Sequence, residues 1–245
     1  MKKILVIGDS CIDKFVYGKC DRICPEAPVP VFTPIETVEN GGMATNVSTN
    51  ISSLEPSIQV TLHTNANVIK KTRYVDFKTN QMLVRVDEND IADRFSRESS
   101  ILDSNYDAVV ISDYDKGFLS DDDIKFLIDK YPLTFIDTKK QIGDWIKGVS
   151  FIKINELEYE KNKTYLGASF KSELIVTLGE KGVRYNDIVS PPTDIVDAFD
   201  LSGAGDTFLA GLVTSYLSGK DIHRSIVFAQ QCASKVISKK GVAVI

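Results

Sequence analysis

The residues best suited to chemistry form one short run, Gly203-Ala204-Gly205-Asp206, directly before an apolar helical stretch. Two glycines around a small residue leave the backbone N–H groups of a helix start open to an anion. Phosphoryl transfer requires mainly positioning and neutralisation of charge, and such N–H groups can supply both. A carboxylate in the first helical turn would lie beside the anion, so Asp206 is a candidate general base.

A second interpretation of this run involves no catalysis. The glycines could form an ordinary tight turn, and Asp206 could serve only to cap the helix. The run is not a Walker A loop, because no Gly-Lys-Ser/Thr follows it, and the dinucleotide pattern GxGxxG is absent. The local pattern leaves both interpretations open.

The elements that must position this run follow from hydrophobic spacing. An amphipathic helix is expected from 208 to 217, with Gly219 as its stop, and a second helix from Asp221. Short apolar runs at 4–7, 109–112, 134–137, 151–154 and 174–178 alternate with helical segments, which predicts an α/β fold with a mainly parallel sheet. Several of these runs end in a polar residue, and ligands bind at the carboxyl ends of parallel strands.

Two further segments, 30–38 and 73–87, are extended and mixed in polarity, with no helix between their strand-like pieces. They are interpreted as a small antiparallel flap. An ordinary edge hairpin would show the same pattern.

Composition excludes several classes of protein. The 245-residue chain has a net charge of −5, which does not favour nucleic acid or an anionic membrane as a partner. Cys11, Cys20, Cys24 and Cys232 lack the paired spacing of a zinc site and are interpreted as reduced thiols. Only four apolar residues precede Gly8, too few for a signal peptide, and no segment is long enough to span a membrane, so a cytoplasmic location is expected.

Four motifs stand in one order along the chain. They are Gly41-Gly42-Met43-Ala44-Thr45-Asn46, Asn155-Glu156-Leu157-Glu158 (NxxE), Thr177-Leu178-Gly179-Glu180-Lys181-Gly182 (TLGxxG) and Asp200-Leu201-Ser202-Gly203-Ala204-Gly205-Asp206. In these motifs the chain resembles the ribokinase-like (PfkB) carbohydrate kinases, whose signature is DTTGAGD. The resemblance implies a three-layer sandwich with a mainly parallel central sheet and a small antiparallel β flap, or lid. It implies one kinase domain over 1–245, with the flap at about 12–38 and 72–88.

Within that family the chain is most similar to the D-glycero-D-manno-heptose 7-phosphate kinases. Their RISPEAPVPV resembles RICPEAPVPV at 22–31, and their SDYGKG resembles SDYDKG at 112–117. This likeness implies ATP-dependent phosphorylation of the anomeric hydroxyl, giving the 1,7-bisphosphate, with Asp206 as base and the Gly203–Gly205 amides at the phosphate.

The resemblance also implies roles on the sugar side. Asp13, Gly41, Gly42 and Asn46 would contact sugar hydroxyls, with the glycines allowing close approach to the backbone. Without the family, Asp13 could simply stabilise a turn, and the glycine pair could simply start a helix.

Further roles concern ATP and Mg²⁺. Asn155 and Glu158 would order Mg²⁺ through water, although Glu158 could equally be a solvated helix charge. Thr177, Gly179 and Gly182 would line the nucleotide pocket, and the helix around Gln231 and Ser234 would form the adenine wall. Without the family, the first three would indicate only a strand and a turn.

A phosphorylated sugar also needs a cation for its distal phosphate. The family's DPK element resembles Asp137-Thr138-Lys139, which implies substrate contacts for Asp137 and Lys139. Lys139 is the first choice for the phosphate, followed by Arg73 or Arg85 on the flap. Each of the three could instead be a surface charge.

The chain departs from the family pattern in length and in detail. Only 55–71 bridges the distance from 54 to the flap, where family members usually have a further strand, helix and strand, so the chain is interpreted as a shortened member. Ser202 and Gln230 replace the usual threonine and asparagine, which leaves the identity of the sugar open. A kinase of another sugar or sugar phosphate, or a sugar- or nucleotide-binding protein without catalysis, remains an alternative. The resemblance also implies a homodimer formed through the flap.

Overall fold

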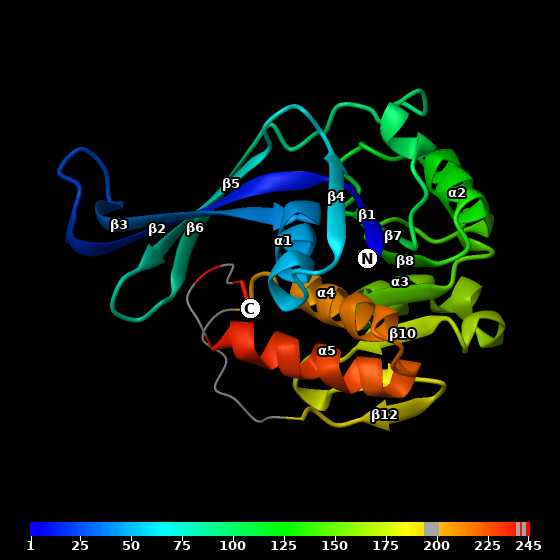
Figure 1. The fold of residues 1–245 in the computed structure, drawn as a ribbon. Coiled ribbons are helices and arrows are strands. Elements are labelled where there is room, and N and C mark those ends of the chain that lie inside the picture. The colour runs from blue at the N-terminus through cyan, green and yellow to red at the C-terminus, as the bar shows by residue number, and fades with distance from the viewer. Residues whose placement is uncertain (194–200, 239–240, 242–243) are drawn as a thin grey trace.

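The structure, a computed structural model, describes residues 1–193, 201–238, 241 and 244–245 (Figure 1). Their strands form a sheet of eight strands and a separate sheet of four. The large sheet has the order β12-β11-β10-β9-β8-β7-β1-β4. Its strands are β1 (Lys3–Gly8), β4 (Gln59–Thr64), β7 (Ala108–Asp113), β8 (Thr134–Thr138), β9 (Phe151–Asn155), β10 (Leu174–Thr177), β11 (Val183–Tyr185) and β12 (Ile188–Ser190).

All neighbours from β4 to β10 in this sheet are parallel, which confirms the mainly parallel sheet predicted from the alternating pattern. The hairpin of β11 and β12 extends the sheet at one end in the antiparallel sense.

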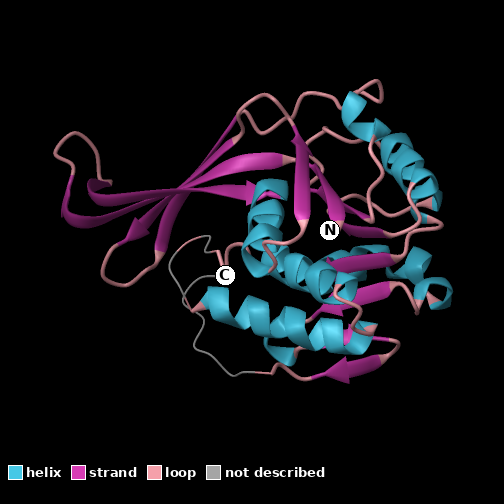
Figure 2. Ribbon diagram, viewed as in Figure 1, coloured by secondary structure: helices cyan, strands magenta, loops and turns pink. Residues whose placement is uncertain are grey.

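Helices cover both faces of the large sheet (Figure 2). Because successive side chains of a strand point to opposite faces, Leu5 and Ile7 enter one core and Ile4 and Val6 the other. The first core includes residues of α2 (Asp121–Lys130) and α3 (Glu156–Leu166). The second packs against α1 (Ala44–Leu54), α4 (Ala204–Leu217) and α5 (Ile222–Ile237). The predicted three-layer α/β sandwich is thereby confirmed. Short 3₁₀ turns lie at Ser100–Asp103, Asp144–Ile146, Ala168–Phe170 and Gly179–Lys181.

The four-stranded sheet, the flap, projects away from these layers (Figure 1). It has the order β3-β2-β5-β6, from β2 (Ser10–Ile23), β3 (Pro30–Met43), β5 (Lys70–Asp76) and β6 (Met82–Glu88). Two of its strand pairs are antiparallel as expected, whereas the central pair β2–β5 is parallel. The reason is topological: β2 continues from β1 and β5 follows β4, and β1 and β4 are themselves parallel neighbours.

Among the described residues, no helix is long and apolar enough to cross a membrane.

Candidate active site

Asp206 lies in the first turn of α4, where the chain enters the helix from a left-handed glycine. Gly203 has φ 79° at the N-cap, a conformation that side-chain-bearing residues rarely adopt. The helix carries the Asp206 side chain inward, and only 3% of the residue remains exposed. Asp200, at the start of the same motif, lies outside the described residues.

Two donors from distant parts of the chain meet the Asp206 carboxylate. The Tyr114 hydroxyl donates to Oδ1 at 2.7 Å, and Nδ2 of Asn46 donates to Oδ2 at 3.0 Å. The Asn46 amide is oriented in turn by Asn50, whose Nδ2 donates to its Oδ1 at 2.9 Å. Asn46, predicted to contact sugar, therefore contacts the candidate base in this structure.

Burial raises the pKa of Asp206 to about 6, even though the hydrogen bonds from Tyr114 and Asn46 act to lower it. The Tyr114 hydroxyl remains protonated, because burial and the nearby Asp206 charge raise its pKa well above the usual value. Asp206 is thus a carboxylate that accepts a proton more readily than an ordinary aspartate, as general-base catalysis requires.

Asp9 holds the loop that presents Tyr114. Its buried carboxylate accepts backbone N–H groups from Tyr114 at 2.7 Å, Lys116 at 3.3 Å and Phe118 at 3.2 Å. Sequence reasoning noted SDYDKG at 112–117 but assigned no role to Tyr114 or Asp9. The sequence feature that indicated a role for Asp9 was its position, as a polar residue directly after the first buried strand.

A buried lysine lies against the glycine turn, and sequence reasoning missed it. Lys153, in β9, is 3% exposed and pairs with Asp137 at 2.6 Å between Nζ and Oδ2. A Cβ on Gly205 would lie only 2.9 Å from the Lys153 Nζ, so the ammonium group lies directly beside the turn. A lysine within the apolar strand FIKIN was the signal, because charged residues are seldom fully buried unless they are paired.

Asp137 and Lys139 lie near Lys153. We call the set of Asp206, Tyr114, Asn46, Lys153, Asp137 and Lys139 the Asp206 cluster. Although burial acts to raise it, the pKa of Asp137 is lowered overall by the ammonium groups of Lys153 and Lys139. Lys139 forms ion pairs with Asp137 and Glu158, and its Nζ lies 5.0 Å from the centre of the Tyr114 ring. Burial acts to lower the pKa of Lys139, but these two carboxylates raise it above its usual value.

Asn155 and Glu158 form a reciprocal cap at the start of α3. The Glu158 N–H donates to Asn155 Oδ1 at 2.9 Å, and the Asn155 N–H donates to Glu158 Oε2 at 2.8 Å. Glu158 is buried rather than solvated, with Lys139 on its other oxygen. No group of three or more His, Cys, Asp or Glu side chains able to hold a metal ion occurs in the described part of the chain.

Asp13 lies at the junction of flap and core. It forms an ion pair with Arg73 of β5, whose guanidinium carbon lies 5.0 Å from the centre of the Phe15 ring. A Cβ on Gly42 would lie 2.0 Å from Asp13 Oδ2, so only glycine fits there while Asp13 keeps this position. Gly41 is similarly crowded, because a Cβ would lie 2.3 Å from Thr45 Cγ2.

Arg85 faces Arg73 across the flap. The two are direct register partners on β5 and β6, and Arg85 donates to both oxygens of Asp87 at 2.7 Å. Like charges directly opposite each other in a sheet are unfavourable, and here each arginine is accompanied by a carboxylate, Asp13 for Arg73 and Asp87 for Arg85.

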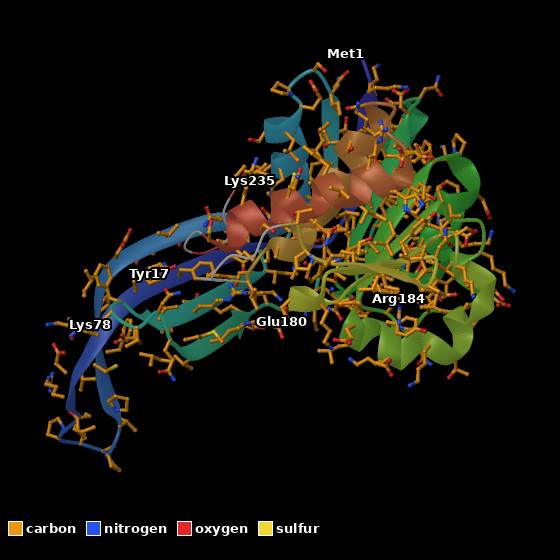
Figure 3. All side chains as sticks on the ribbon, turned by 90° about the horizontal axis from the view of Figure 1, so that it is seen from below. Met1, Tyr17, Lys78, Glu180, Arg184 and Lys235 are labelled. Atoms are coloured by element: carbon orange, nitrogen blue, oxygen red, sulfur yellow. The ribbon has the colours of Figure 1, made fainter. Side chains whose placement is uncertain are left out.

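The residues predicted for the nucleotide lie on two separate elements, the end of β10 with the turn after it and helix α5. Thr177 ends β10, and Gly179 and Gly182, with φ of 59° and 96°, bound the turn that follows. In the view of Figure 3, Glu180 of this turn lies where the core approaches the flap. Gln231 and Ser234 lie on α5, at least partly exposed. No hydrogen bond or ion pair between described residues joins these five predicted positions to the Asp206 cluster.

Fold and site together define a class of protein: an α/β enzyme with a buried carboxylate and a buried ammonium group at the glycine-rich start of a helix. The family model described as pfkB family carbohydrate kinase matches residues 121–244. The chain therefore belongs to the pfkB family of carbohydrate kinases.

The relatives are consistent with this assignment. The chain is 30% identical to the bifunctional protein HldE of Helicobacter pylori strain J99 over 301 positions, covering 99% of this chain and 64% of that protein. The chain thus spans less than two thirds of the length of this relative. The alignment has 301 positions and the chain only 245 residues, so the relative has additional residues within the matched region.

Solved structures share the fold at low sequence identity. Ribokinase from Thermotoga maritima superposes with a TM-score of 0.75 at 17% identity, covering 99% of this chain and 95% of that one. Arabidopsis thaliana ribokinase, solved in complex with ribose and ATP, superposes with a TM-score of 0.68 at 12% identity, covering 98% and 93%.

Proposed function

We propose that this carbohydrate kinase transfers the γ-phosphoryl group of ATP to the anomeric hydroxyl of D-glycero-D-manno-heptose 7-phosphate. The observation that carries the proposal is the Asp206 carboxylate, buried beside the glycine turn with a pKa raised to about 6. The choice of heptose rests on the resemblance at 22–31 and 112–117 and on the likeness to HldE. The choice of ATP is supported by the nucleotide in a ribokinase of the same fold.

In the proposed reaction, Asp206 accepts the proton of the sugar hydroxyl as its oxygen attacks the γ-phosphorus. The bond from that phosphorus to the bridging oxygen breaks, ADP leaves, and the proton passes from Asp206 to solvent. The backbone N–H groups of the 203–206 turn and the Lys153 ammonium group face the transferring phosphoryl group and neutralise its charge.

A magnesium ion would supply further neutralisation of the phosphate charge. Because Mg²⁺ keeps several of its waters, it is usually bound through one or two carboxylates together with substrate phosphates, and a neighbouring amide can contact a bound water. Glu158 and Asn155 provide such a pair at the start of α3. These two residues fit a water-mediated role, with Lys139 compensating the Glu158 charge.

For the distal phosphate we propose Arg73 and Arg85, with Lys139 as the alternative. Each of the three already has a carboxylate partner: Lys139 pairs with Asp137 and Glu158, Arg73 with Asp13, and Arg85 with Asp87. The two arginines lie directly opposite each other on β5 and β6, so one phosphate would contact two guanidinium groups.

The test is turnover of Mg-ATP against a panel containing the heptose 7-phosphate, fructose 6-phosphate and a pentose. We expect turnover on the heptose alone. Turnover on another sugar but not on the heptose would support a sugar kinase and contradict the assignment of heptose 7-phosphate as its substrate.

Catalysis by Asp206 is tested with Asp206→Asn. Loss of a general base is expected to lower kcat by about 10²- to 10⁴-fold. An unchanged kcat would reject the role of Asp206 and favour a binding protein. Thermal melting provides the folding control. Because burial raises the pKa of Asp206 from 3.8 to about 6, stability falls as the pH rises between these values and the loss is complete at pH 7.5. A cooperative thermal melt of Asp206→Asn at pH 7.5 shows that the variant is folded.

A further inference from the structure

Strand β4 forms one end of the eight-stranded sheet and, among the described residues, pairs only with β1 (Figure 1). The Gln59 N–H donates to Lys2 O, so Gln59, Thr61 and His63 direct their backbone groups toward β1. The backbone groups of the alternate residues, Val60, Leu62 and Thr64, therefore point away from the sheet. Within the described residues they have no hydrogen-bond partner.

The other three sheet edges carry features that discourage pairing with another chain. β12 is only three residues long. β3 contains Pro30, Pro34, Glu36 and Glu39, and β6 contains Arg85, Asp87 and Glu88.

β4 has none of these features. Its six residues, QVTLHT, include no proline, lysine or carboxylate, and its register with β1 is continuous, without a bulge. An open, uncharged and regular edge is a template for a further strand.

The depletion of charge extends beyond the strand. In the 30 residues from 40 to 69, which include α1 and β4, Glu55 is the only Asp, Glu, Lys or Arg, whereas 26% of the whole chain is charged. The exposed residues of α1 are Thr49, Ser52 and Ser53. Surfaces that become buried between proteins are depleted in charge at their centre.

We propose that β4 pairs with β4 of a second copy of this chain. Antiparallel pairing about a two-fold axis places Leu62 opposite Leu62 of the second copy and Val60 opposite its Thr64, so that all outward N–H and C=O groups find partners. The same axis brings the two α1 helices together through uncharged side chains. A neutral strand is suited to its own copy, because self-pairing opposes no like charges.

This interface differs from a dimer formed through the flap, which would use β3 or β6. It is also independent of the sugar that the enzyme phosphorylates. The two arrangements are distinguished by substitutions at each edge.

The experiment is sedimentation velocity of the full chain at micromolar concentration. The parent chain is expected to be a dimer. Leu62→Lys and Leu62→Glu, which oppose like charges across the axis, should each raise the dimer dissociation constant at least about tenfold. Mixing the two variants should restore a dimer, because the charges then attract.

Val84→Lys, at an exposed position on β6, is the matched control and should leave the dimer intact. Because Leu62 packs partly against the core, Thr64→Pro is a second variant: it removes an outward N–H without touching the β1 ladder. A monomeric parent chain, a dimer lost in Val84→Lys but kept in the β4 variants, or no dimer in the mixture would overturn the proposal.

Discussion

At the scale of single residues, Asp206 illustrates how burial and hydrogen bonding oppose each other at a base. Tyr114 and Asn46 stabilise the ionised carboxylate, while burial destabilises it more, and the resulting pKa of about 6 leaves the group ionised near neutral pH. The carboxylate is therefore both available and basic enough to accept a proton from a hydroxyl group.

Tyr114→Phe tests this balance. Removing the hydroxyl removes a hydrogen bond that lowers the pKa of Asp206, so the acidic limb of the kcat profile should move to higher pH by about one unit. The measurement is kcat from pH 5 to 9 in parent and variant. Burial raises the pKa of Asp113 to about 7. This residue is present in both the parent and the variant, so its titration affects both pH profiles equally. An acidic limb that stays in place would show that Tyr114 does not act on the base.

At the scale of elements, the loop after β7 is held by the carboxylate of Asp9, which directly follows β1. Asp9 accepts three N–H groups of 114–118, which places the Tyr114 hydroxyl against α4. Two strands that are neighbours in the sheet thus cooperate to present one side chain.

Asp9→Ala should leave these buried N–H groups unpaired and lower the free energy of unfolding by about 3 kcal/mol, with a loss of kcat as Tyr114 moves. Urea denaturation and steady-state kinetics measure the two effects. Ser120→Ala is the control: it removes the cap of α2 just beyond the loop, at a cost of about 1 kcal/mol, and should leave kcat unchanged. Equal kinetic effects of both variants would indicate general loosening instead of positioning.

At the scale of the whole molecule, the flap and the layered core offer two separate sets of charged groups. Arg73 and Arg85 belong to the flap, whereas Lys153 and Lys139 belong to the core beside α4. Asp13 and Gly42 lie where β2 and β3 connect the two.

If the flap arginines and the core lysines bind different substrates, substitutions in the two sets should change different kinetic constants. Arg73→Met should raise KM for the sugar phosphate about tenfold or more and leave KM for ATP nearly unchanged, because a charge-assisted contact to the distal phosphate is lost. Lys153→Met should mainly lower kcat. Arg73→Lys, which keeps the charge, should recover part of the lost affinity. A rise in KM for ATP alone in Arg73→Met would contradict the assignment.

Much of the fold was predictable from the sequence because it depends on local spacing. Alternating apolar runs predicted the parallel sheet, and the glycines at 203 and 205 predicted an open helix start with Asp206 in its first turn. The ordered motifs predicted the family, which the family model confirms.

The tertiary structure alone decided which side chains meet. Tyr114, Asn46 and Asp206 are far apart in the chain, and Lys153 reaches the glycine turn only because β9 lies near the start of α4 in the folded layers. The parallel pairing of β2 with β5 likewise follows from the order of β1 and β4 in the other sheet. Local patterns determine each element and its buried face, but contacts between elements depend on strand order and register, which arise only when the whole chain packs.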